Sequence, residues 1–220
     1  MIYVNKTLKW IVTILIPVLL ILASIRILLT PLFLEMEYRL PGFPADSYGF
    51  TMDERLKWSK VAVEYLLNDA NISYLGDLTF PDGSPLFIQR ELSHMLDVKI
   101  LVQQVLTVFY LLIGVVLIIG LLAWRTNWIS DYWSAVSRGG WLTIFLILAV
   151  LVLVILNFNL IFTGFHRIFF QGDTWIFLYS DTLIRLFPIR FWQVVFISLG
   201  VTSILSSLVL GLLGRKLSRG

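Results

Sequence analysis

The chain has 220 residues, of which 58% are hydrophobic and 14% charged, against about 45–50% and about 25% in ordinary globular proteins. A soluble domain of this length cannot bury so much apolar surface, so the composition predicts an integral membrane protein. There is no cysteine, which excludes disulfides, thiolate nucleophiles and cysteine-based metal sites. The net charge of +3 includes no basic cluster suited to nucleic acid, so no nucleic-acid partner is expected.

Four apolar stretches are long enough to cross a bilayer, which takes about 20 residues. They are 10–29, 100–124, 141–163 and 191–213. The first follows Lys6 and Lys9, and we interpret it as an uncleaved anchor because it is too long for a signal peptide and no clear cleavage site follows it. The sequence predicts an α-helical integral membrane protein with four transmembrane helices and a small α+β extracellular domain.

The distribution of basic residues predicts the orientation. The two termini and the 125–140 connection carry Lys and Arg opposed only by Asp131, which places them in the cytoplasm. The expected organisation is 1–29 cytoplasmic N-terminus and first span, 30–99 extracellular domain, 100–124 second span, 125–140 cytoplasmic loop, 141–163 third span, 164–190 interfacial extracellular segment, and 191–220 fourth span and basic cytoplasmic tail.

The two outward segments are too large to be simple connectors. Thr51 and Glu54 form a capping-box pattern that predicts a helix over about 52–68. Asp82-Gly83 is a hairpin signal, weakened by the prolines on either side of it. The 164–190 segment is apolar but interrupted by charge, which is typical of a re-entrant or surface-lying helix at the membrane interface.

The only histidines, His94 and His166, both fall at the outer mouth of a predicted span. Histidines at the same depth can meet in space, and imidazoles exchange protons near neutral pH. Each can also be a simple interfacial polar side chain, but ionisable groups at membrane depth are more often functional. Patterns for serine hydrolases, zinc proteases, P-loops and dinucleotide binding are absent, which leaves acid–base chemistry.

Six further residues are candidates for orienting the histidines or stabilising an oxyanion: Glu91, Asp97, Asn159, Arg167, Asp181 and Arg185. In a helix, Glu91 and Asp97 flank His94 on one face, where a carboxylate would orient the imidazole and raise its basicity. Ordinary ion pairs are the alternative: Asp97 can pair with Arg90, Lys99 or Arg185, and Asp181 can pair with Arg185 four residues later. For Asn159, helix packing is at least as good an explanation.

Four motifs resemble those of a known family. They are His-Met-x-Asp-Val-Lys at 94–99, Phe-His-x-Ile-Phe-Phe at 165–170, Asp-x-Trp at 173–175 and Asp-Thr-Leu-Ile-Arg-Leu-Phe-Pro at 181–188. With four spans and a large outward loop, the chain resembles the lipoprotein intramolecular transacylase (Lit) family of Gram-positive bacteria over nearly its whole length. Gly172, where Asn is commoner, and Tyr179-Ser180, in place of a Pro-containing pair, depart from the pattern.

The resemblance implies a bacterial cytoplasmic membrane enzyme whose active site faces outward. It implies transfer of the sn-2 acyl chain of an S-diacylglyceryl group to the α-amine of the N-terminal cysteine of a lipoprotein, giving the lyso form without a cofactor or metal. We expect His94 as general base and His166 as acid or oxyanion donor, with the reverse assignment also open. Phe165, Phe169, Phe170 and Trp175 are expected to contact acyl chains. The expected partners are a diacylated lipoprotein and membrane lipid, and the sequence indicates no oligomeric state.

Other function classes stay open on the residues alone. An intermolecular phospholipid or lipoprotein acyltransferase would use the same histidines, and a non-enzymatic receptor or scaffold would tolerate their loss. A transporter should place polar groups at the bilayer midplane, whereas Gln103, Asn157 and Gln193 lie near the outer ends of the spans.

Overall fold

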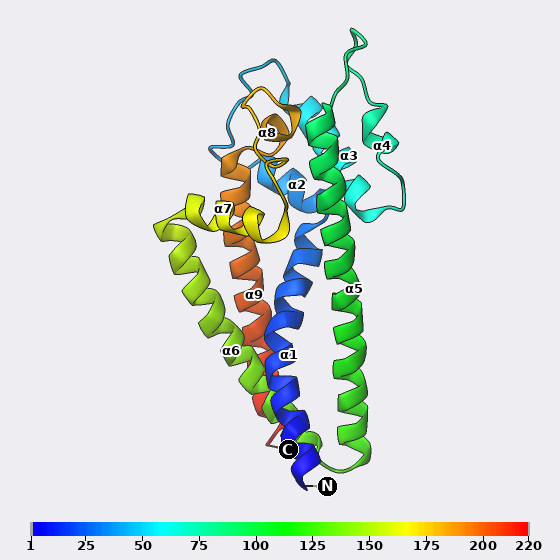
Figure 1. The fold of residues 1–220 in the computed structure, drawn as a ribbon. Helices are drawn as coiled ribbons and strands as arrows, with labels where there is room; N and C mark the ends of the chain where they lie inside the picture. The colour runs from blue at the N-terminus through cyan, green and yellow to red at the C-terminus, as the bar shows by residue number, and fades with distance from the viewer. Residues whose placement is uncertain (1, 220) are drawn as a thin grey trace. The chain divides into compact units, whose positions relative to one another are not determined.

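The structure is a computed structural model that describes residues 2–219, with side chains described from residue 6 onward. Nine helices follow one another in this part of the chain (Figure 1): α1 Ile2–Leu28, α2 Pro31–Tyr38, α3 Met52–Leu67, α4 Ser73–Gly76, α5 Gln89–Arg125, α6 Ile129–Leu156, α7 Phe158–Phe169, α8 Thr182–Leu186 and α9 Ile189–Leu217.

Four of these helices are long and apolar enough to cross a membrane: α1 from Lys6 onward, α5, α6 and α9. The protein is therefore membrane-integral, as its composition predicts. The bounds differ from those expected, because α5 and α6 extend well beyond their apolar centres. The expected third span, 141–163, is divided: α6 ends at Leu156, and Asn157 caps a separate helix, α7, by accepting a hydrogen bond from the Leu160 N–H at 3.0 Å.

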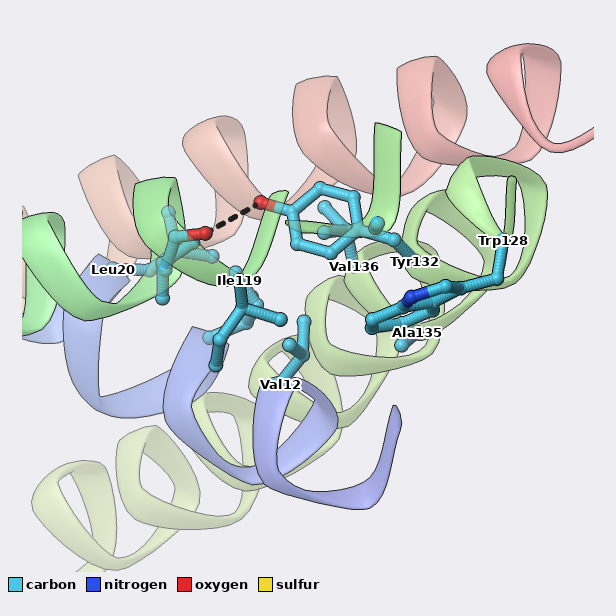
Figure 2. Packing of buried hydrophobic residues seen from close by; sticks show 10 residues of the cluster. Val12, Leu20, Ile119, Trp128, Tyr132, Ala135 and Val136 are labelled. Carbon is cyan, nitrogen blue, oxygen red and sulfur yellow. Dashed lines mark hydrogen bonds between the residues drawn. The ribbon is translucent and has the colours of Figure 1, made fainter. Parts of the chain in front are cut away.

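The chain forms two compact units. One comprises the chain up to Ile27, Val105–Leu156 and the chain from Ile197 onward. Its core joins parts of α1, α5 and α6 (Figure 2), where the Tyr132 hydroxyl donates to the Val116 carbonyl at 3.2 Å. The buried residues are Val12, Ile16, Leu20, Val116, Ile119, Ala123, Trp128, Tyr132, Ala135 and Val136.

Small residues let the helices of this unit approach closely. A Cβ added at Gly140 would lie 2.9 Å from the carbonyl oxygen of Ser207, so only glycine fits this α6–α9 contact. The Ser137 hydroxyl donates to the Gly211 carbonyl at 2.8 Å beside it. Lipid tails are as apolar as the helix surfaces, so the hydrophobic effect does not drive membrane helices together. Close packing and interhelical hydrogen bonds of this kind stabilise their association instead.

The second unit comprises Leu28–Gln104 and Asn157–Phe196. It contains α2, α3, α4, α7 and α8, together with the first turns of α5 and α9. One core cluster consists of Phe50, Ala62, Tyr65, Leu66, Leu75, Leu86, Phe87, Met95, Leu183 and Leu186. A smaller cluster joins Leu34 and Tyr38 of α2 to Phe191 of α9. All candidate site residues belong to this unit.

The start of α3 confirms the predicted capping box. The Thr51 hydroxyl accepts a hydrogen bond from the Glu54 N–H at 3.2 Å, and the Glu54 carboxylate accepts from the Thr51 N–H at 2.8 Å. Two N–H groups that a helix start leaves without partners are satisfied in this way.

The expected α+β character of this unit is wrong. Residues 2–219 contain no strand, only an isolated bridge between Thr79 and Pro85. The Asp82-Gly83 turn does bring its flanks together, because the Leu86 N–H donates to the Leu78 carbonyl at 2.8 Å. Pro85 has no N–H to donate, however, so the pairing does not extend into a ladder.

Candidate active site

The two histidines, which are far apart in the sequence, lie side by side. His94 is in the second turn of α5, and His166 is in the last turn of α7. Their ring centroids are 6.0 Å apart, and the ring planes are inclined by only 22°. Each residue is 8% exposed. The fold therefore places two nearly parallel imidazoles in a shielded environment.

Aromatic side chains surround this pair. Phe170 and Phe177 meet the His94 ring edge-on, with centroids 5.0 Å and 5.3 Å away. The ring centroids of Phe162 and Trp175 lie 4.3 Å and 5.0 Å from that of His166. We call these four residues the aromatic box. Such an environment excludes water and strengthens electrostatic interactions within it.

The hydrogen bonds of the two imidazoles differ. Nδ1 of His166 is 2.8 Å from the carbonyl oxygen of Phe162, one turn earlier in α7. Since a carbonyl only accepts, Nδ1 carries the proton and Nε2 keeps a free lone pair. Burial lowers the pKa of His166 below its ordinary 6.5, although the bond to Phe162 acts in the opposite direction. Nδ1 of His94 is buried and has no partner within residues 2–219.

Glu91 is fully buried one turn before His94, but it does not bond to the imidazole. Its two carboxylate oxygens accept from backbone N–H groups, one from Ile88 at 2.8 Å and the other from Leu183 at 2.6 Å. It closes the start of α5 and ties it to α8. We expected Glu91 to bond to the His94 ring, but both of its carboxylate oxygens accept from backbone N–H groups instead. Glu91 therefore has a structural role.

Three other expected supports do not contact the histidines. Asp97 is half-buried and takes part in none of the four ion pairs found in the described chain. Asn159 and Arg167 are exposed on α7. Successive residues of an α-helix are rotated by about 100° around its axis. Arg167 therefore projects in a different direction from His166, away from His94.

Asp181 and Arg185 pair with other residues rather than with each other. Asp181 accepts from Nη2 of Arg90 at 2.7 Å, and Arg185 forms a two-point contact with Asp46 at 3.2 and 3.0 Å. The guanidinium of Arg185 also lies 3.7 Å from the ring centroid of Phe50. Asp181 and Arg185 each make a separate tertiary contact, and these two contacts hold the loops around α8 in place.

The expected acyl-contact residues divide into two groups. Phe170 and Trp175 belong to the aromatic box, and Phe165 touches the edge of His166 with centroids 5.6 Å apart. Phe169 is 49% exposed and packs on Phe165 instead. Phe162 and Phe177 also belong to the aromatic box, although the sequence did not predict them. A helix pattern could have indicated Phe162, four residues before His166, whereas nothing local marks Phe177.

No group of three or more His, Cys, Asp or Glu side chains is placed to hold a metal ion within residues 2–219. The functional groups gathered at the site are two imidazoles and the backbone around them. Such groups suit proton transfer and hydrogen bonding to a developing oxyanion.

A family model described as "Lipoprotein intramolecular transacylase Lit" matches residues 10–192. The chain belongs to this family. It is accordingly a membrane acyltransferase of the lipoprotein intramolecular transacylase class, as the motifs around the two histidines suggested.

Other comparisons agree over the full length. An uncharacterized protein of Aquifex aeolicus (strain VF5) is 29% identical over 219 residues, covering 98% of both chains. The membrane-integral lipoprotein intramolecular transacylase Lit from Bacillus cereus shares the fold, with a TM-score of 0.83, 21% identity, and coverage of 100% of this chain and 98% of the other. A histidine-to-alanine variant of that protein gives a TM-score of 0.77 at 20% identity, covering 99% and 94%.

Proposed function

We propose that this Lit family member moves the sn-2 acyl chain of an S-diacylglyceryl lipoprotein to the α-amine of the same lipoprotein's N-terminal cysteine, using His94 and His166. The observation that carries the proposal is the pair of shielded, nearly parallel imidazoles 6.0 Å apart. The amine and the ester belong to one substrate, so the enzyme's task is to fold them together and to manage protons.

The reaction balances with two proton transfers. The neutral amine attacks the ester carbonyl carbon, and one imidazole takes the proton that the nitrogen loses. The tetrahedral intermediate then expels the glycerol sn-2 oxygen, which receives a proton from an imidazole. One ester bond breaks and one amide bond forms, so no nucleotide is consumed.

We assign the general base to His166. A base needs a free lone pair and a fixed orientation, and both follow from the Nδ1 hydrogen bond to Phe162, which leaves Nε2 as an acceptor. The lowered pKa keeps the ring neutral at pH 7, so that it can accept a proton. This assignment reverses the first expectation, which rested on Glu91 and Asp97 flanking His94.

His94 then stabilises the oxyanion or protonates the leaving oxygen. Its buried Nδ1 has no partner in the described chain, and an unsatisfied buried polar atom is costly in a folded protein. A substrate oxygen that accepts a hydrogen bond from His94 would remove this cost. Such a donor counts most where charge develops in a water-poor site.

The site faces the outer leaflet in this proposal, with both termini in the cytoplasm. The positive-inside distribution supports this orientation. Helix α7 supports an interfacial position, since Leu160 and Ile168 are 67% and 76% exposed while His166 on the same helix is buried. Acyl chains of a membrane-anchored substrate could then reach the aromatic box along the bilayer surface.

Paired amide substitutions test the assignment. Gln can place a hydrogen-bond donor near the position of Nε2, but neither Gln nor Asn can accept and return a proton. We therefore expect His166→Gln and His166→Asn to lose turnover by about 10²–10⁴-fold. His94→Asn should retain more activity than His94→Gln, because the Asn amide lies near the position of Nδ1, the His94 atom that is left without a partner in the described chain. Equal retention by the two His166 variants at near wild-type turnover would refute the assignment.

A further inference from the structure

The segment 170–181, which we call the strap, covers both histidines. It connects α7 to α8 and contributes Phe170, Trp175 and Phe177, three of the four rings of the aromatic box. Because each histidine is only 8% exposed, a glyceryl ester and an amine cannot contact both imidazoles while these rings stay in place. Access for a substrate requires the strap to move.

The two ends of the strap differ in how they are held. At its start, Phe170 is bonded to α7 through the His166 carbonyl at 2.8 Å, and Gly172 adopts a φ of +67°. Just beyond its other end, the Thr182 hydroxyl donates to the Leu86 carbonyl at 2.6 Å, and the Leu183 N–H donates to Glu91. Movement can therefore be confined to the strap, with α7 and α8 remaining fixed.

One ion pair fastens the strap over His94. Nη2 of Arg90 lies 2.7 Å from Asp181, whose same oxygen accepts from the Leu178 N–H at 2.8 Å. The guanidinium also lies 5.6 Å from the ring centroid of Phe177, the ring that meets His94 edge-on. Arg90 thus contacts both the end of the strap and the ring that closes the site.

This contact is suited to opening and closing. The Arg90 side chain is 41% exposed, whereas that of Asp181 is 9% exposed, and ion pairs with an exposed member contribute little to stability. Outside this contact, Ile176, Leu178 and Tyr179 of the strap are all at least half exposed. Opening therefore breaks the Arg90–Asp181 pair and the packing of Phe170, Trp175 and Phe177 on the histidines.

We propose that the strap is a gate over the histidine pair, closed by the Arg90–Asp181 latch and opened to admit the acylated end of the substrate. The inference rests on the proposed function for its purpose, but the gate itself is a physical property of the free enzyme. Arg90 and Asp181 are positioning residues, since they act through Phe177 and the strap rather than on reacting atoms.

Chemical modification of histidine measures the gate without turnover. The chain has only two histidines, so diethyl pyrocarbonate applied to tag-free protein reports on this site alone when followed by the absorbance of the modified imidazole. Arg90→Gln and Asp181→Asn should each raise the modification rate about fivefold, the factor that corresponds to a pair of about 1 kcal/mol. Lys60→Gln breaks another exposed ion pair, with Glu35, and should leave the rate unchanged.

Cross-linking tests the same gate in the opposite direction. The natural chain lacks cysteine, so Arg90→Cys with Asp181→Cys can be bridged by a short bis-methanethiosulfonate reagent and released with reductant. The bridged protein should react slowly with diethyl pyrocarbonate and lose transacylation, and reductant should restore both. The thioether of the substrate survives this reductant.

The two readouts separate the gate from the proposed function. If neither the latch variants nor the bridge changes the modification rate, the gate is overturned, even if transacylation proceeds. Rates that respond to the latch in a protein without transacylation would keep the gate and refute the proposed function instead.

Discussion

The carboxylate of Glu91 accepts a hydrogen bond from the Leu183 N–H at 2.6 Å, which joins the first turn of α5 to α8. The same carboxylate accepts from the Ile88 N–H at 2.8 Å. His94 lies one turn further along α5, so its position depends on a contact made 92 residues away in sequence. The site is therefore held by buried hydrogen bonds from backbone N–H groups to a carboxylate, rather than by a carboxylate bonded to an imidazole.

The change Glu91→Gln tests this tie. An amide keeps one acceptor but directs its NH2 group at a backbone N–H, so we expect a loss of about 1–3 kcal/mol in the free energy of unfolding together with a lower kcat. Thermal unfolding in detergent and turnover below the transition measure the two effects. Glu54→Gln makes the same change at the exposed capping box of α3 and should leave kcat unaltered. A Glu91→Gln protein with wild-type stability and kcat would contradict the tie.

Alanine substitution of aromatic residues should distinguish the box from its surroundings. Phe177→Ala removes a ring that meets His94, and Trp175→Ala removes one that faces His166. Both should lower kcat by about tenfold or more, because water and misaligned substrate then enter the site. Phe169→Ala, on the exposed side of α7, should have less than a threefold effect. Equal losses in all three variants would mean that the rings act through general packing.

Glu37 of α2 is expected to make stability depend on pH. It is 1% exposed, its carboxylate oxygens have no hydrogen-bond partner within the described chain, and burial raises its pKa to about 7 despite the attraction of Arg190. Because the folded pKa exceeds the unfolded value of 4.5, the stabilisation is present below pH 4.5 and is lost as the pH rises through 7.

The comparison of wild type with Glu37→Gln isolates this group. The difference in unfolding free energy should change by about 3 kcal/mol between pH 4.5 and pH 8, in favour of Gln at the higher pH. Melting temperatures across that range provide the measurement. A difference that stays constant with pH would show that Glu37 titrates normally.

The pH dependence of catalysis should reflect the lowered pKa of His166. Since burial lowers the pKa of His166 below 6.5, its protonation should reduce kcat only below that pH. At the alkaline side, kcat/KM should rise through the pKa of the substrate amine, about 7.7–8.0. Imidazole NMR on a protein with two histidines gives the pKa directly. A His166 pKa above 6.5 would argue against its role as a neutral base at pH 7.

The sequence predicts the membrane helices well because each depends on a long apolar run, a property of local composition. The division of α6 from α7 was missed because it depends on one residue, Asn157, whose side chain caps the new helix. Thr51 and Glu54 were correctly interpreted since both partners lie within one turn. The strand expectation failed at Pro85, where the ladder lacks a donor.

The other differences between the predicted and the observed site come from contacts between residues far apart in the sequence. Asp181 was a candidate support of the histidines, with a pair to Arg185 as the alternative, but the folded chain brings Arg90 to it. Phe177 carries no local signal, and only the path of the strap places its ring against His94. The two histidines were identified because they are the only ones in the chain and both sit at the mouth of a span.

Mass spectrometry of a lipoprotein's N-terminal peptide determines whether this chain moves an acyl group within one substrate molecule. A diacyl lipoprotein from cells without any other N-acylating enzyme is compared with and without this chain, and with its His166→Asn variant. We expect an unchanged total acyl count with one chain moved from glycerol to the amine, and no movement with the variant. A gain of one acyl chain would instead show transfer from a second molecule, and no change with well-expressed protein would contradict the transacylase function.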